Sequence, residues 1–81
     1  MQLEEFKVLV KSATSGLKVC HPITGNWQYK EYVNAFTATC KSSAALMKGG
    51  YQVHLWKDEN IALLLKLSST GNHTKIKDIH L

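Results

Sequence analysis

The chain has no arginine, and ten lysines supply its strongly basic side chains. An arginine guanidinium holds a planar set of donors that reads guanine edges and clamps phosphates, whereas a lysine ammonium attracts anions with little geometric selection. Sequence-specific reading of duplex nucleic acid is therefore not expected. A net charge of +4 still favours a weak, non-specific contact with nucleic acid.

The chain also lacks any apolar run that approaches the roughly 18 residues of a membrane span. Its first six residues have neither the basic nor the apolar region of a secretory signal. We therefore expect a soluble, cytoplasmic protein with no membrane contact. In a reducing compartment, Cys20 and Cys40 are expected to be small core residues and not a disulfide.

With 81 residues the chain is long enough for one hydrophobic core, so residues 1–81 are expected to form a single domain. Phe6, Val8 and Val10 alternate with Lys7, Leu9 and Lys11, which predicts a strand over residues 5–11. Residues 17–20 fit a short returning strand that ends before a proline.

The apolar period changes after Asn26, where offsets of three and four predict an amphipathic helix over residues 26–48. Asn26 suits the N-cap, and the glycines at 49 and 50 suit the C-terminal end. The apolar stripe consists of Tyr29, Tyr32, Val33, Phe36, Cys40, Ala44 and Met47. The β-branched residues at 37 and 39 support an alternative, with a strand over 29–35 and a short helix over 39–48.

Two strand-like runs, 51–57 and 61–67, flank the polar residues 58–60 and predict a hairpin. Residues 74–81 fit either a short edge strand or a helical turn. The fold class predicted is α+β, with an antiparallel sheet of three to five strands, one long helix packed on one face, and the order β(β)αββ.

One face of this sheet is expected to lie under the helix and form the core. That core is predicted to contain Phe6, Val8, Val10, Tyr51, Val53, Leu55, Ile61, Leu63, Leu65 and Leu67. The opposite face is mixed, and it is the predicted partner-binding face. Its residues are Lys7, Leu9, Lys11, His54, Trp56, Leu64 and Lys66.

A mixed face that carries a tryptophan needs a cover or a partner. Ile76, Ile79 and Leu81 could pack over Trp56 and Leu64; the other candidates are a second copy of the chain and a foreign protein. Trp27 is expected to be a core or capping aromatic. The sequence leaves these alternatives open.

No motif for chemistry stands out. Five candidate metal ligands lack the spacing that positions a zinc ion, namely Cys20, His21, Cys40, His54 and His73. A Cys40–His54 nucleophile pair is disfavoured because a core thiol is inert. The carboxylates Glu4 and Glu5, and Asp58 and Glu59, lie at a terminus and a turn. We therefore expect no enzyme activity, no metal and no cofactor.

The expected elements are a strand, a helix carrying Ala44 and Ala45, the glycine pair at 49 and 50, and the hairpin of 51–56 and 61–67. This order of elements resembles small phage-encoded anti-CRISPR and other anti-defence proteins. The resemblance spans residues 26–67. It implies an inhibitor that binds a host nucleic-acid-processing complex in the host cytoplasm. The function expected is thus a non-enzymatic protein-binding inhibitor, with a lysine-rich single-strand or non-specific nucleic-acid-binding module as the alternative.

Overall fold

The computed structural model describes residues 1–16, 27–41, 50–67 and 72–81. One helix comes first and strands follow it. The elements are α1 (Leu3–Ala13), β1 (Trp27–Glu31), β2 (Ala35–Lys41), β3 (Gly50–Trp56), β4 (Ile61–Leu67) and β5 (His73–His80). Among the described residues, no helix has the length and apolar character needed to cross a membrane.

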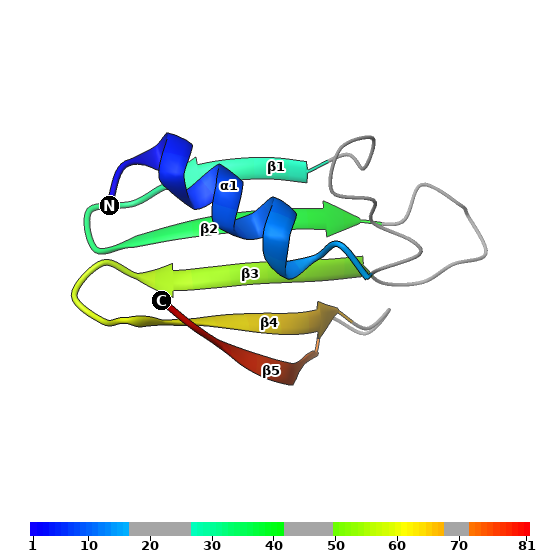
Figure 1. The fold of residues 1–81 in the computed structure, drawn as a ribbon. Coiled ribbons are helices and arrows are strands. Elements are labelled where there is room, and N and C mark those ends of the chain that lie inside the picture. Colours follow the sequence, from blue (N-terminus) through cyan, green and yellow to red (C-terminus); the bar gives the residue numbers. More distant parts are fainter. Residues whose placement is uncertain (17–26, 42–49, 68–71) are drawn as a thin grey trace.

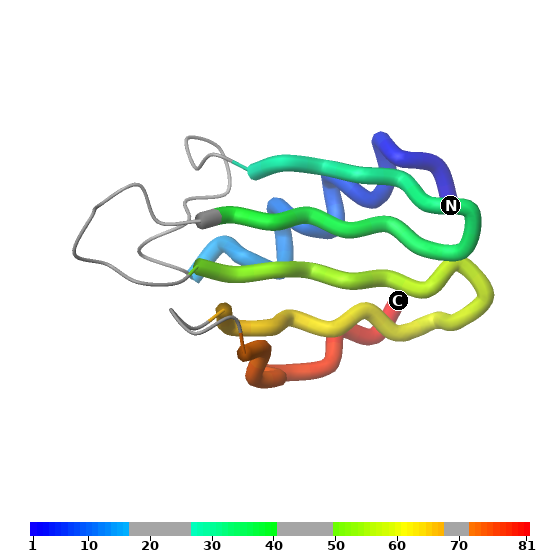
Figure 2. Tube along the Cα trace, turned by 180° about the vertical axis from the view of Figure 1, so that it is seen from behind, coloured from blue at the N-terminus to red at the C-terminus, as the bar shows by residue number. Residues whose placement is uncertain are grey.

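The strands form one antiparallel sheet in which each strand lies beside the next in chain order, β1-β2-β3-β4-β5. Helix α1 crosses one face of this sheet (Figure 1). Seen from behind, the other face of the central strands has no described segment in front of it (Figure 2). The described chain is therefore a two-layer structure with one covered face and one open face.

Helix α1 forms because its first turn is well capped and its apolar residues recur at helical spacing. The backbone N–H of Gln2 donates to Oε1 of Glu5 at 2.9 Å, which completes the helix start. Phe6 and Val10 lie one turn apart and are fully buried, whereas Val8 between them is 66% exposed. Acidic residues in the first turn and Lys11 in the last turn also suit the helix dipole.

The predicted strand over residues 5–11 is therefore wrong. Phe6 and Val10 share a face in a strand of period two and also in a helix of period 3.6. These two residues therefore do not distinguish a strand from a helix in such a short segment. Val8 separates them, because a strand would place it beside Phe6 and Val10 and the helix turns it toward solvent.

The long helix predicted over residues 26–48 is also wrong wherever the structure describes it. Residues 27–31 and 35–41 are the paired strands β1 and β2, and residues 42–49 lie outside the described residues. The β-branched Thr37 and Thr39 pack well on a pleated surface, and the alternation buries Phe36 and Ala38 on one face. The alternative strand over 29–35 misplaced the turn, which lies between β1 and β2. The element order is thus αβββββ, not β(β)αββ.

The hairpin predicted over 51–57 and 61–67 is confirmed as β3 and β4. Its register pairs Val53 with Leu64 and Leu55 with Ala62. Strand β4 therefore turns its even-numbered residues toward the helix, opposite to the expected arrangement. Of the two options for residues 74–81, the edge strand is the one found. The strand expected over 17–20 lies outside the described residues.

The core lies between α1 and the sheet. It consists of Phe6, Val10, Phe36, Ala38, Val53, Leu55, Ala62 and Leu64. The rings of Phe6 and Phe36 stack with centroids 5.3 Å apart, and Tyr29 meets Phe6 edge-on at 6.4 Å. Trp27 packs against this cluster, as expected of a core aromatic.

Cys40 corrects a further expectation. It is 2% exposed on the helix side of β2 and forms a disulfide, so the prediction of free core cysteines is wrong. The other cysteine of the chain, Cys20, lies outside the described residues. Disulfides persist mainly in oxidising compartments. The expectation of free thiols rested on a reducing compartment, and the cytoplasmic location stays a prediction.

Two valine substitutions test the helix directly. Val10→Ala removes buried methyl groups and is expected to lower the free energy of unfolding by roughly 2 kcal/mol. Val8→Ala is expected to change it by less than about 0.5 kcal/mol, since Val8 is exposed and alanine is the better helix former. Urea unfolding followed by circular dichroism measures both. Equal losses at the two positions would support a strand instead.

Candidate functional site

The open face of the sheet, defined as the face turned away from α1, is assembled from the residues that alternate with the core. Cross-strand partners in an antiparallel sheet point to the same side. Thr37 pairs with His54 and His54 with Leu63, so one row of side chains crosses β2, β3 and β4 on this face. Across the sheet the face changes from polar to apolar.

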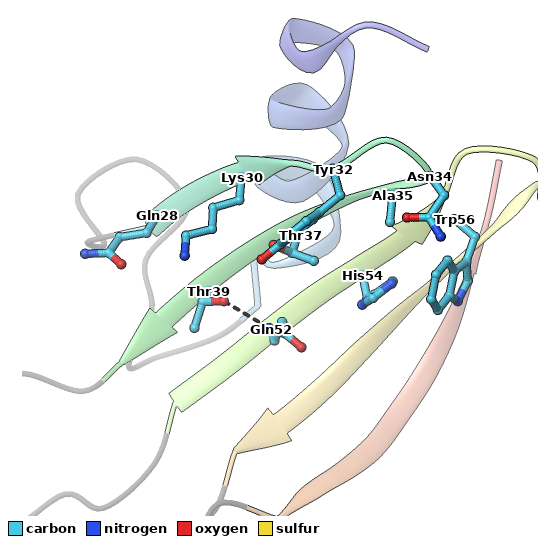
Figure 3. Close-up of a pocket in the computed structure, with 10 residues that line it drawn as sticks. All are labelled: Gln28, Lys30, Tyr32, Asn34, Ala35, Thr37, Thr39, Gln52, His54 and Trp56. Carbon is cyan, nitrogen blue, oxygen red and sulfur yellow. Dashed lines mark hydrogen bonds between the residues drawn. The ribbon is translucent and has the colours of Figure 1, made fainter.

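The part of the open face over β1, β2 and β3 is hollowed into a groove of about 590 Å³, which we call the polar groove (Figure 3). It is lined by Gln28, Lys30, Tyr32, Asn34, Ala35, Thr37, Thr39, Gln52, His54 and Trp56. Its volume lies within the range of small-molecule sites. Gln28 and Thr39 lie at one end, and Asn34, Ala35 and Trp56 at the other.

Amides and hydroxyls supply most of the polar atoms of this groove. Nε2 of Gln52 donates a hydrogen bond to Oγ1 of Thr39 at 3.1 Å, across the β2–β3 pair. This bond uses one amide donor of Gln52 and leaves its other donor and its carbonyl oxygen capable of further bonds. A bound molecule can thus find both donors and acceptors along the floor of the groove.

Ring side chains lie toward the other end. The rings of His54 and Trp56 are in contact, with centroids 4.3 Å apart and planes tilted by 45°. Trp56 is 38% exposed and Tyr32 is 49% exposed, so both keep open ring surface. An exposed aromatic face can stack on another flat ring.

The groove is positive at neutral pH. Among the described residues that line it, Lys30 carries the one formal charge, and the lining contains no carboxylate. Two carboxylates elsewhere on the sheet are held by lysines: Glu31 contacts Lys57 at 2.7 Å, and Asp78 contacts Lys75 at 3.3 Å. The charge of the groove favours an anionic ligand.

Burial lowers the pKa of His54 below its ordinary value. Its Nε2 atom is buried and has no hydrogen-bond partner among the described residues. The imidazole is therefore neutral at pH 7 and adds ring surface to the groove without adding charge.

Beside the polar groove lies a second part of the open face, the leucine row, on β4. It consists of Ile61, Leu63, Leu65 and Leu67. Ile61 is 38% exposed, and the three leucines are half-buried. The water-facing side of an antiparallel sheet is ordinarily polar, so an apolar row at this position is a surface suited to a partner.

The predicted partner-binding face is not one surface in the structure. His54 and Trp56 lie on the open face, but Leu64 is 2% exposed in the core and Leu9 packs against that core from α1. Lys7 and Lys11 also belong to α1, and Lys66 shares the helix side of β4 with Leu64. The predicted face is divided because residues 5–11 form a helix and not a strand, and because the side chains of β4 point to the opposite sides of the sheet from those predicted.

Sequence reasoning missed the β1 and β2 contributions to the groove, above all Lys30, Tyr32 and Thr37. Assigning residues 26–48 to a helix put Tyr32 on the apolar stripe expected to face the sheet, and it kept Lys30 and Thr37 out of the predicted open face. A period-two pattern was present all the same: Trp27 and Tyr29 alternate with polar residues, and so do Phe36 and Ala38. That alternation is the signal by which the groove was predictable.

Of the alternatives that the sequence left open for the second face, cover by the C-terminal segment is not what the structure shows. Strand β5 extends the sheet at its edge, and Ile79 packs against the core on the helix side. Ile76 and Leu81 are 46% and 51% exposed. Within the described ranges, no helix or strand therefore lies across Trp56 or the leucine row.

The structure also places the candidate nucleophile pair and the candidate metal ligands. Cys40 lies on the helix side of β2 and His54 on the open side of β3, so the two do not form a nucleophile pair. Within the described ranges, no three histidine, cysteine or acidic side chains cluster as metal ligands would.

No protein-family model, curated protein or solved structure matches the chain.

The lowered pKa of His54 predicts a pH dependence of folding. The unfolded chain takes up this proton near pH 6.5, whereas the folded chain takes it up only at lower pH. Stability from a neutral His54 is thus fully present above about pH 6.5 and is lost as the pH falls below that value. Urea unfolding of wild type and His54→Gln should give curves that converge between neutral and acidic pH.

Thr37→Val, which alters a non-titrating neighbour of His54 across the β2–β3 pair, is the control, because it should leave the pH dependence of the wild type in place. Wild-type and His54→Gln stabilities that stay a constant distance apart across this range would contradict the assignment.

Proposed function

We propose that this chain is a non-enzymatic binding protein that takes a single-stranded nucleic acid on its open face. The observation that carries the proposal is the composition of the polar groove, which combines three ring side chains with a lysine and no carboxylate. Bases stack on aromatic rings, and lysines attract the phosphates between them.

A single strand fits the groove better than a duplex. The bases of a single strand can turn toward a protein surface, while those of a duplex are stacked and show only their edges in the grooves. The chain has no arginine for bidentate base reading. The ring faces of Tyr32 and Trp56 instead offer stacking, which every base can use.

The amides and hydroxyls of the groove support the same ligand class. Gln28 and Gln52 each carry donors and an acceptor, and Thr37 adds a hydroxyl beside Lys30 in the register of β1 and β2. Such groups bond to base edges and sugar hydroxyls without strong selection among bases. The expected binding is thus weakly sequence-dependent.

A titration of fluorescently labelled single-stranded and duplex oligonucleotides, followed by anisotropy at two salt concentrations, tests the proposal. The single strand is expected to bind more tightly than the duplex and to weaken steeply with salt. Trp56→Ala should cost about 1–3 kcal/mol of binding through lost stacking. An absence of single-strand binding at low salt would contradict the proposal.

Two charge variants test whether the ligand binds on the open face. Lys30→Gln should weaken binding and reduce the slope of log affinity against log salt by about 0.7, the value of one phosphate contact on a single strand. Lys11→Gln makes the same change at an exposed position of α1 and should leave the affinity and its salt dependence unaltered. Equal effects of the two variants would show that binding is spread over the whole surface.

The leucine row favours a second candidate, a protein partner. Trp56 and Ile61 border an apolar row that no described segment covers, and exposed apolar patches with a tryptophan are frequent centres of protein interfaces. Inhibition of a host defence complex, the function implied by the resemblance to anti-defence proteins, is the most concrete form of this candidate.

Leu65→Lys tests this candidate, because it places a charge in the middle of the leucine row. A partner that uses the row should be retained by the immobilised wild type and lost with Leu65→Lys, a change of 2 kcal/mol or more at a hot spot. Val8→Lys, on the exposed side of α1, is the control and should retain the partner. Retention by both variants would exclude the row.

A further inference from the structure

The end of the polar groove near Trp56 is built as a slot. Tyr32 is the first residue after β1, in the turn to β2, and Trp56 is the last residue of β3, opposite Ala35 in the register of β2 and β3. Ala35 is 3% exposed and carries the smallest side chain that lines the groove. Figure 3 shows Ala35 and Asn34 between Tyr32 and Trp56 at this end of the groove, with the ring of Tyr32 extending toward Thr37.

Backbone hydrogen bonds hold the parts of the slot in place. The N–H of Tyr32 donates to the carbonyl of Ala35 at 2.7 Å and closes the turn between β1 and β2. The N–H of Lys57, which follows Trp56, donates to the carbonyl of Asn34 at 2.9 Å. These two bonds hold the turn that carries Tyr32 and Asn34 against the start of β2 and the end of β3.

His54 supports Trp56 from within the sheet. Its ring lies against the indole at a centroid distance of 4.3 Å, so one side of the indole is occupied by protein. The rest of the indole contributes to its 38% exposed fraction. A supported ring loses less conformational freedom when a ligand stacks on it than a free one does.

We infer that one nucleobase of the bound strand inserts into this slot, stacked on Trp56 and Tyr32 above Ala35. The inference rests on the proposed single-strand function and names the part of the ligand that this end of the groove takes. A base suits the slot because its flat faces match ring side chains, while its polar edge can bond to the amide of Asn34. The phosphates of the strand then follow the groove toward Lys30.

The inference is tested with two labelled strands of about eight nucleotides, within the usual range of single-strand sites. One is an oligothymidylate, and the other has the same length and phosphate charge but abasic residues throughout. The intact strand is expected to bind at least tenfold more tightly at low salt. Equal affinities would overturn the base slot and leave a purely electrostatic single-strand site. Binding of neither strand would overturn the proposed function itself.

Two leucine variants locate the base. Ala35→Leu fills the floor of the slot and should reduce affinity for oligothymidylate at least tenfold while affinity for the abasic strand stays the same. Ser12→Leu puts the same side chain at an exposed position of α1, outside the groove, and should change affinity less than threefold. An equal loss from both variants would overturn the placement. Where Ala35→Leu does not fold, Trp56→Leu compared with Trp56→Phe answers the same question, since phenylalanine alone restores stacking.

Discussion

The stacking of Phe6 on Phe36 is the contact on which the rest of the structure depends. It attaches helix α1 to β2, and both elements share one buried cluster with the apolar residues of β3 and β4. Because side chains alternate along a strand, the choice of one face for the core assigns every other residue of the sheet to the opposite face. In the part of the chain that the structure describes, the open face exists because one short helix covers only the opposite side.

The open face then combines two surfaces of different chemistry. Over β1 to β3 it is a groove of amides, hydroxyls, rings and a lysine, and over β4 it is a row of apolar side chains. These surfaces share Trp56 as a neighbour, so a ligand on either one contacts the same indole. For this reason Trp56 alone does not distinguish a nucleic acid from a protein partner, whereas Lys30 and Leu65, on different strands, do.

Part of this arrangement was predictable. The β3–β4 hairpin followed from two apolar runs around a polar turn, and His54 and Trp56 were correctly placed on one face because they are two residues apart on one strand. Helix α1 and the strands β1 and β2 were not predictable in this way. Phe6 and Val10 fit both the strand period and the helix period, and the aromatic residues from 29 to 36 recur at helical spacing. Lys30 and Tyr32 were lost from the candidate site with that assignment.

The sequence by itself determined the composition of the surfaces: lysine without arginine, polar residues alternating with apolar ones, and two tryptophans. Only the tertiary structure decided which of these residues meet. A strand has a period of two, so a shift of one residue in the β3–β4 register would put Leu64 on the open face in place of Leu63. Pairing between separate strands and packing against α1 set that register, and neither is contained in a local pattern.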